Sequence, residues 1–134
     1  DSKPRLLFLP GYGCSVTMYA KFLNKLRESY QVTAIDQLGL GTSGKPEYNL
    51  TDAQDCIDYF VGSLRAWMLT TKYDEHGEFY LCGHSLGGYV STFYALRYPQ
   101  NIKKLVLFSP VGIPPAPTQN DPAELARESD SFKT

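Results

Sequence analysis

The sequence has little net charge, few cysteines and no long apolar run, and each shortage excludes a class of function. The 134 residues carry a formal net charge of −1, so a basic surface for nucleic acid is not expected. No apolar run approaches the length of a membrane span. The three cysteines are odd in number and lack the spacing of a metal site, which favours reduced thiols in an intracellular protein. We therefore expect neither a metal nor a cofactor.

Apolar and amphipathic stretches alternate along most of the chain, in a pattern typical of an α/β fold. The apolar runs predict buried strands, and the stretches between them carry apolar residues at helical spacing. The predicted strands are residues 5–9, 31–36, 79–82 and 104–108, and the predicted helices are residues 19–30, 52–71 and 86–98. This order predicts a mostly parallel sheet with helices on both faces.

The composition changes after residue 109. Five of the nine prolines lie between Pro110 and Pro122. We therefore divide the chain into residues 1–109, which hold the sheet, and residues 110–134, which begin a different segment. Because the chain starts at Asp1 without a methionine, we expect that its natural N-terminus, and any targeting segment, has been removed.

A glycine-rich loop follows the second predicted strand. Its letters Gly39-x-Gly41-x-x-Gly44 match a dinucleotide fingerprint, but that fingerprint must lie directly between a strand and a helix. Pro46 follows the loop and no helix is predicted before Thr51, so dinucleotide binding is not expected. The spacing of a phosphate-binding P-loop is also absent.

A glycine-flanked serine follows the third predicted strand. Gly83-His84-Ser85-Leu86-Gly87 fits G-x-S-x-G, the nucleophile elbow, in which a tight strand-to-helix turn exposes a serine hydroxyl. The turn strains the serine backbone and brings the strand and the helix close together. The two flanking positions must then lack side chains, and glycine satisfies this.

With these motifs in place, the chain resembles the first half of an α/β-hydrolase over residues 5–117. The motifs are the turn Pro10-Gly11-Tyr12-Gly13, the loop Asp36-x-x-Gly39-x-Gly41-x-Ser43, and the elbow extended by Gly88. Residues 105–115 are similar to the abhydrolase-domain branch of lipid metabolism, which includes a lysophospholipase and a lipid-droplet co-activator of triglyceride lipase. The resemblance implies an α/β-hydrolase fold, truncated after the strand that follows the elbow helix. Residues 110–134 would then start a cap or linker.

The resemblance also implies roles for individual residues. Ser85 matches the nucleophile, and the backbone N–H groups of Leu86 and Tyr12 match the oxyanion donors. Asp36 is expected to brace its own glycine loop. The family usually has histidine before Gly11, and this chain has proline there. We expect a looser brace on that turn without loss of the donor.

The rest of a catalytic triad is not visible. In this family the acid and the histidine follow the serine along the chain. Both histidines of this chain, His76 and His84, precede Ser85. We expect His84 to point away from the serine and His76 to lie in a polar connection at the remote end of the sheet. The acids after Ser85 stand in the tail and none is a good orienting acid (Asp121, Glu124, Glu128 and Asp130).

We therefore interpret the chain as a fragment of a serine ester hydrolase that acts on acyl lipids, inactive on its own. The alternatives are an inactive lipid-binding or lipase co-activator module, and a prolyl aminopeptidase-like peptidase or C–C hydrolase. The expected partners are an acyl lipid or another small ester, with peripheral association with a membrane or lipid droplet and no nucleic acid. The expected location is the cytoplasm or the surface of a lipid droplet, the endoplasmic reticulum or a mitochondrion.

Overall fold

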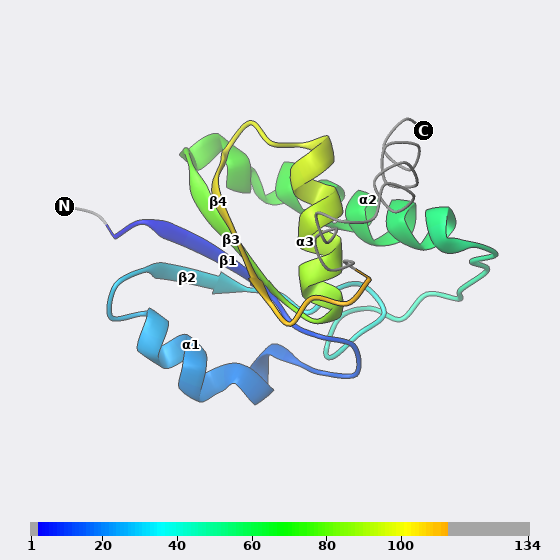
Figure 1. The fold of residues 1–134 in the computed structure, drawn as a ribbon, viewed down its shortest axis with the longest axis horizontal. Helices are drawn as coiled ribbons and strands as arrows, with labels where there is room; N and C mark the ends of the chain where they lie inside the picture. The colour runs from blue at the N-terminus through cyan, green and yellow to red at the C-terminus, as the bar shows by residue number, and fades with distance from the viewer. Residues whose placement is uncertain (1–2, 113–134) are drawn as a thin grey trace, which may run out of the picture.

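The computed structural model describes residues 3–112 and shows a single parallel sheet (Figure 1). Its strands lie in the order β2-β1-β3-β4, and every neighbouring pair is parallel. The strands are β1 (Arg5–Leu9), β2 (Gln31–Ala34), β3 (Phe79–His84) and β4 (Ile102–Phe108). The predicted parallel sheet is confirmed. The fourth strand begins two residues before the predicted start at Lys104, since Ile102 already pairs with Phe79.

Helices cover both faces of this sheet, as predicted (Figure 1). A 3-10 turn, η1 (Val16–Tyr19), leads into α1 (Ala20–Leu26) on one face. The long helix α2 (Ala53–Thr71) and the helix α3 (Leu86–Arg97) pack on the other face. Asp52 caps α2, because its carboxylate accepts a hydrogen bond from the Asp55 amide at 2.8 Å.

The strands are apolar on both sides because each side meets a helix layer. On β1, Leu7 and Leu9 join the core under α2 and α3, while Leu6 and Phe8 join the smaller core under α1. All four side chains are almost fully buried. The continuous apolar run of the first strand follows from this two-sided burial.

The chain winds outward from the middle of the sheet in two directions. From β1 it crosses by α1 to β2 on one side, and from β3 it crosses by α3 to β4 on the other side. The direction of winding therefore reverses between β1 and β3. In open α/β sheets, ligands bind outside the carboxyl ends of the strands at such a reversal. The topology places the residues after Leu9 and His84 at this point.

Two local features have no clear signal in the sequence. The polar connection 72–78 contains a second 3-10 turn, η2 (Tyr73–His76), and Tyr73 is buried beneath the Arg5 guanidinium, which lies 4.0 Å from the centre of its ring. Ser15 precedes η1 but does not cap it, because its hydroxyl donates to Asp36 instead.

Candidate active site

Ser85 occupies the turn between β3 and α3, with φ of 53° and ψ of −116°. A residue with a Cβ rarely adopts a positive φ, so the backbone is strained here. Main-chain hydrogen bonds hold the turn: the Ser85 amide donates to the Phe108 carbonyl at 3.0 Å, and the Val111 amide donates to the Ser85 carbonyl at 3.3 Å. Within residues 3–112 the Ser85 hydroxyl has no hydrogen-bond partner and is half-buried.

The glycines of the elbow stand where two backbones touch. A Cβ on Gly83 would lie 2.2 Å from the carbonyl oxygen of Gly87, and a Cβ on Gly87 would lie 2.2 Å from that of Leu9. Backbone atoms cannot yield to such contacts as a flexible side chain can. The predicted strand–turn–helix around Ser85 is confirmed, and so is the close approach of the strand and helix backbones.

The turn after β1 lies directly against the serine. A Cβ on Gly11 would lie 3.1 Å from the Cβ of Ser85 and 3.0 Å from Nδ1 of His84. Tyr12 follows at the tip of this turn with its side chain 78% exposed. Leu86 is the first residue of α3, so its N–H has no acceptor inside the helix. The residues predicted as nucleophile and oxyanion donors therefore lie at the same point of the sheet.

His84 does not face Ser85 but the turn after β1. Its Nδ1 lies 2.7 Å from the hydroxyl of Tyr19, and that hydroxyl accepts a hydrogen bond from the Gly11 amide at 3.2 Å. In addition, the buried side-chain amide of Gln37 donates to the Pro10 carbonyl at 2.9 Å. The expectation of a looser turn stays a prediction. Proline removes one imidazole, but Tyr19, His84 and Gln37 hold the same turn.

Asp36 joins two loops near the carboxyl ends of β1 and β2. Its carboxylate accepts hydrogen bonds from the Val16 amide (2.7 Å), the Ser15 hydroxyl (3.0 Å), and the amide (2.8 Å) and hydroxyl (2.9 Å) of Thr42. Burial alone would raise the pKa of Asp36, but these hydrogen bonds outweigh it and hold the pKa below its usual value. The structure thus places Asp36 as an ionised brace that reaches beyond its own glycine loop. No helix follows that loop until Ala53.

Neither histidine is placed to activate Ser85. His76 ends η2 and lines a polar hollow with Arg5 and Gln31, the first residues of β1 and β2. It therefore lies at the amino ends of the strands, opposite Ser85. The four tail acids and most of the segment 110–134 lie outside the described residues. A base and an acid for Ser85 are not found within residues 3–112.

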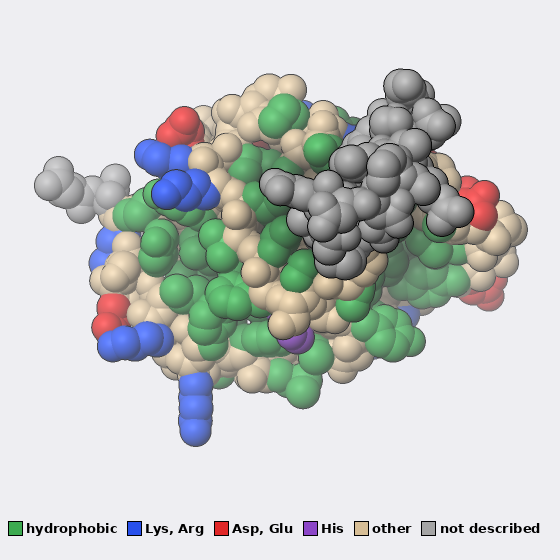
Figure 2. Space-filling model, in the orientation of Figure 1, with side chains coloured by type: hydrophobic (Ala, Val, Ile, Leu, Met, Phe, Trp, Pro, Cys, Tyr) green, Lys and Arg blue, Asp and Glu red, His purple; other side chains and the backbone are tan. Residues whose placement is uncertain are grey.

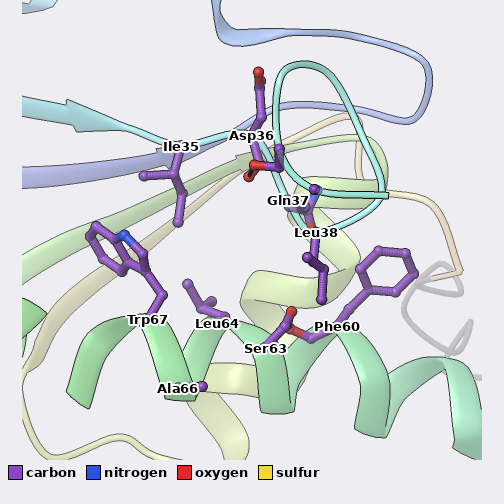
Figure 3. A pocket seen from close by; sticks show the side chains of 11 residues that line it. Ile35, Asp36, Gln37, Leu38, Phe60, Ser63, Leu64, Ala66 and Trp67 are labelled. Carbon is purple, nitrogen blue, oxygen red and sulfur yellow. Dashed lines mark hydrogen bonds between the residues drawn. The ribbon is translucent and has the colours of Figure 1, made fainter. Parts of the chain in front are cut away.

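An apolar pocket of about 470 Å³ lies beside the Asp36 loop (Figure 3). Trp67 and Phe60 project into it from α2, facing the chain that follows β2. Gln37 also lines it, and the side-chain oxygen of this residue is buried without a hydrogen-bond partner in the described part of the chain. Ser85 does not line this pocket, so the pocket is separate from the elbow.

The sequence profile of the alpha/beta hydrolase fold family matches residues 4–132. The chain belongs to the α/β-hydrolase fold family. The wound parallel sheet and the serine turn after β3 agree with this membership.

Curated relatives of this α/β-hydrolase carry names from lipid metabolism. The chain is 34% identical over 112 residues to a probable 1-acylglycerol-3-phosphate O-acyltransferase of Oryza sativa subsp. japonica, covering 84% of this chain and 26% of the relative. It is 33% identical over 120 residues to a (lyso)-N-acylphosphatidylethanolamine lipase of Mus musculus, covering 90% of this chain and 33% of the relative. The chain thus spans about a quarter to a third of the length of these relatives.

A solved structure shows the same fold in an enzyme of another class. The 2-hydroxy-6-oxo-6-phenylhexa-2,4-dienoate hydrolase from Rhodococcus sp. strain RHA1 aligns with a TM-score of 0.70 at 26% identity, over 93% of this chain and 43% of that enzyme. Its likeness extends over nearly the whole chain, and it supports assignment to the hydrolases of this fold.

Sequence reasoning missed Tyr19 and Gln37, which both reach the turn after β1. Tyr19 falls at the start of the predicted helix 19–30, where its spacing indicates only an apolar face. Gln37 stands next to Asp36 in a loop whose recognisable pattern is its glycines. An aromatic hydroxyl at the start of a helix opposite a glycine turn is a signal that could have found Tyr19, but spacing alone does not show which turn it meets.

Proposed function

We propose that this chain carries the nucleophile and the oxyanion site of a serine ester hydrolase that acts on acyl lipids. The observation that carries the proposal is the position of Ser85. It stands on a strained turn at the point where the winding of the sheet reverses, with its hydroxyl unpartnered in the described part of the chain. The turn after β1 lies against it and brings a second set of backbone amides to the same place.

In the proposed reaction, Ser85 Oγ adds to the ester carbonyl carbon, and the bond from that carbon to the leaving alcohol then breaks. The carbonyl oxygen becomes an oxyanion, which accepts hydrogen bonds from the N–H groups of Leu86 and Tyr12. The N-terminus of α3 adds a partial positive charge at the same point. Each such donor contributes about 3 kcal/mol in the transition state. Water then hydrolyses the acyl-serine.

The proton of Ser85 must pass to a base and from it to the leaving alcohol, and the proposal places this base and its orienting acid in a longer protein. The chain has only two histidines, and neither is placed to reach Ser85 as a base. Because the curated relatives are three to four times as long as their matched part, they have room for both groups. The segment 110–134 would lead from the sheet toward a cap over the acyl pocket.

The names of the relatives support a lipid substrate. They leave two possible acceptors for the acyl group, water and an alcohol. Hydrolysis passes the acyl group from Ser85 to water, whereas an acyltransferase passes it to an alcohol such as that of 1-acylglycerol-3-phosphate. Both reactions share the acyl-serine and the oxyanion site. Acyl transfer is therefore the second candidate, favoured by the name of the rice relative.

A fluorophosphonate probe tests the nucleophile. We expect the complete protein to be labelled and the label to be lost in Ser85→Ala, whereas Ser63→Ala, which removes a hydroxyl that bonds within α2, keeps it. The 134-residue chain should label weakly or not at all. Labelling that survives in Ser85→Ala would contradict the proposal, and strong labelling of the short chain would contradict a base supplied from elsewhere.

Product analysis then separates the candidate functions. The complete protein is incubated with a lysophospholipid, with and without 1-acylglycerol-3-phosphate. Free fatty acid indicates the hydrolase, and an acylated acceptor indicates the transferase. A labelled protein that yields neither product favours the peptidase or C–C hydrolase alternatives. An unlabelled protein that still binds lipid favours the inactive module.

We also propose that the end of the sheet that carries Ser85 faces a lipid surface. Tyr12 and Met18 are 78% and 71% exposed there, which makes them the two most exposed large apolar side chains of the described residues. No helix in the described residues is long and apolar enough to cross a bilayer, so contact with lipid would be peripheral. In flotation with phospholipid vesicles, Met18→Asp should reduce the bound fraction. Leu69→Asp, at an exposed site on α2, should not.

A further inference from the structure

We propose that Tyr19 and His84 are positioning residues: they hold the Gly11–Tyr12 turn against Ser85, and thereby place the Tyr12 N–H for the oxyanion. This inference rests on the proposed function. It assigns a role to two side chains that touch neither the reacting atoms nor the substrate. It also explains why a histidine next to the nucleophile points away from it.

Three elements meet in one chain of hydrogen bonds. The Gly11 amide, after β1, donates to the Tyr19 hydroxyl at 3.2 Å, and this hydroxyl lies 2.7 Å from Nδ1 of His84, at the end of β3. Tyr19 itself belongs to η1. Its ring lies 5.6 Å from the His84 ring and 4.9 Å from that of Phe8, which is fully buried in β1. Tyr19 is therefore fixed by packing as well as by hydrogen bonds.

The first bond of this bridge has a fixed direction. The Gly11 N–H can only donate, so the Tyr19 oxygen accepts from it. The Tyr19 hydroxyl can pair with Nδ1 of His84 in either tautomer, because it donates to a bare Nδ1 and accepts from a protonated one. Burial raises the pKa of Tyr19, so the hydroxyl keeps its proton. With Nδ1 occupied in this way, His84 serves the turn.

The turn has little room to move. A methyl group on Gly11 would stand 3.0 Å from Nδ1 of His84 and 3.1 Å from Cβ of Ser85, so the glycine backbone is packed between the two. Tyr12 is the next residue, and its N–H direction depends on the peptide that Gly11 sets. A shift of well under an ångström at this peptide changes the geometry of an oxyanion donor.

The test is the steady-state kinetics of Tyr19→Phe in the complete protein with an ester substrate. Removing an oxyanion donor costs about 100-fold to 1,000-fold in kcat. Because the variant displaces the donor without deleting it, we expect kcat to fall about 10-fold and KM to change less than 2-fold. Tyr30→Phe is the matched control, since Tyr30 packs in the same core against Tyr80, away from the turn. It should keep the wild-type kcat.

His84 variants test the same bridge from its other end. His84→Leu removes the partner of the Tyr19 hydroxyl and should lower kcat to the level of Tyr19→Phe, and the double variant should be no slower than either single variant. His84→Gln keeps a hydrogen-bonding amide on its side chain and should recover part of the rate. His76→Gln, at the opposite end of the sheet, should leave kcat unchanged.

Two results would overturn the inference. One is a Tyr19→Phe variant that is folded and keeps kcat within 2-fold of wild type. The other is a His84→Leu variant as slow as Ser85→Ala while Tyr19→Phe is unaffected, which would make His84 a base. If the wild-type protein has no esterase activity, the proposed function fails first. The bridge is then tested by amide exchange: Tyr19→Phe should speed exchange at Gly11, and an unchanged rate would refute the bridge.

Discussion

A single methyl group decides whether β3 and α3 can meet at the elbow. In Gly83→Ala the new Cβ would stand 2.2 Å from the Gly87 carbonyl oxygen, so two backbone segments must separate. Overpacking in a core typically destabilises a protein by about 1–3 kcal/mol. Because only backbone atoms can move apart here, we expect Gly83→Ala to lower the free energy of unfolding by about 3 kcal/mol. Chemical denaturation followed by circular dichroism measures this loss.

Gly62→Ala is the matched control for that prediction. Gly62 is exposed within α2 and has open space where a Cβ would be added. Alanine there should stabilise the protein by about 1 kcal/mol through helix propensity alone. If both variants shifted the denaturation midpoint in the same direction, close backbone approach would not be the reason for glycine at position 83.

The carboxylate of Asp36 gives a prediction that depends on pH. Its pKa is lowered in the folded state, so its stabilising contribution is present above its unfolded pKa of about 3.9 and is lost as the pH falls through the folded pKa. Asp36→Asn replaces one carboxylate oxygen with an NH₂ group, which cannot accept from Ser15, Val16 or Thr42. We expect this change to lower the free energy of unfolding by about 2 kcal/mol at pH 7. The gap between wild type and variant should narrow below about pH 4.

Unfolding curves measured at several pH values check the Asp36 prediction. Asp52→Asn is the control, because asparagine caps a helix nearly as well as aspartate, and the change should stay within about 0.5 kcal/mol. A gap between wild type and Asp36→Asn that is the same at pH 3 and pH 7 would mean that the ionised form does not hold the two loops.

At the scale of elements, two ion pairs attach α2 to its neighbours with similar geometry and different burial. Arg65 reaches Asp74 in η2, and Arg97 of α3 reaches Asp58 in α2, each at 2.6 Å. The Arg65–Asp74 side chains are 29% and 17% exposed, against 37% and 55% for Arg97–Asp58. The Arg65 guanidinium also lies 4.9 Å from the centre of the Tyr98 ring. Solvent screens the second pair more strongly.

We expect Asp74→Asn to destabilise the protein by about 2 kcal/mol, because it leaves a guanidinium in a partly dry site without its partner. Asp58→Asn should cost less than about 0.5 kcal/mol. Urea denaturation of both variants under the same conditions makes the comparison. Equal losses would show that burial does not distinguish the two pairs.

Elements were predictable from this sequence where one physical signal fixes them. Two-sided burial makes the strands continuously apolar, and backbone crowding requires the glycines around Ser85. The buried Tyr73 was missed because one aromatic residue in a polar connection has no periodicity. The bridge between Tyr19 and His84 was missed because it joins residues 65 positions apart, and local spacing carries no information on such a pair. The order of the strands in the sheet was not predictable either, because it depends on the direction in which each crossover connection turns.

At the scale of the whole molecule, β2 and β4 are the outer strands of the sheet as far as residues 3–112 describe it. On β4, Leu105 and Phe108 are 36% and 40% exposed, and Figure 2 shows hydrophobic side chains gathered over one face. An apolar outer strand is a site for pairing between chains. We therefore expect the 134-residue chain to self-associate as its concentration rises.

Leu105→Lys should reduce that self-association, because a charge on an outer strand opposes pairing. Dynamic light scattering or sedimentation velocity at several concentrations measures it. Leu96→Lys, at an exposed site on α3 that is 59% exposed, is the control and should change the particle size little. An unchanged particle size in Leu105→Lys would point to a different surface.

The order of the sheet also affects how the protein folds during translation. Of the four strands, β1 is synthesised first. One of its edges can form hydrogen bonds only after β3 has been synthesised, because Arg5 pairs with Phe79 and Leu9 pairs with Gly83. At roughly 5–20 residues per second, translation leaves the β3-facing edge of β1 without its hydrogen-bond partners for several seconds. In that interval its apolar side chains are open to chaperones and to misassembly. Limited proteolysis of ribosome-bound chains should show protection of β1 only once β3 has left the exit tunnel.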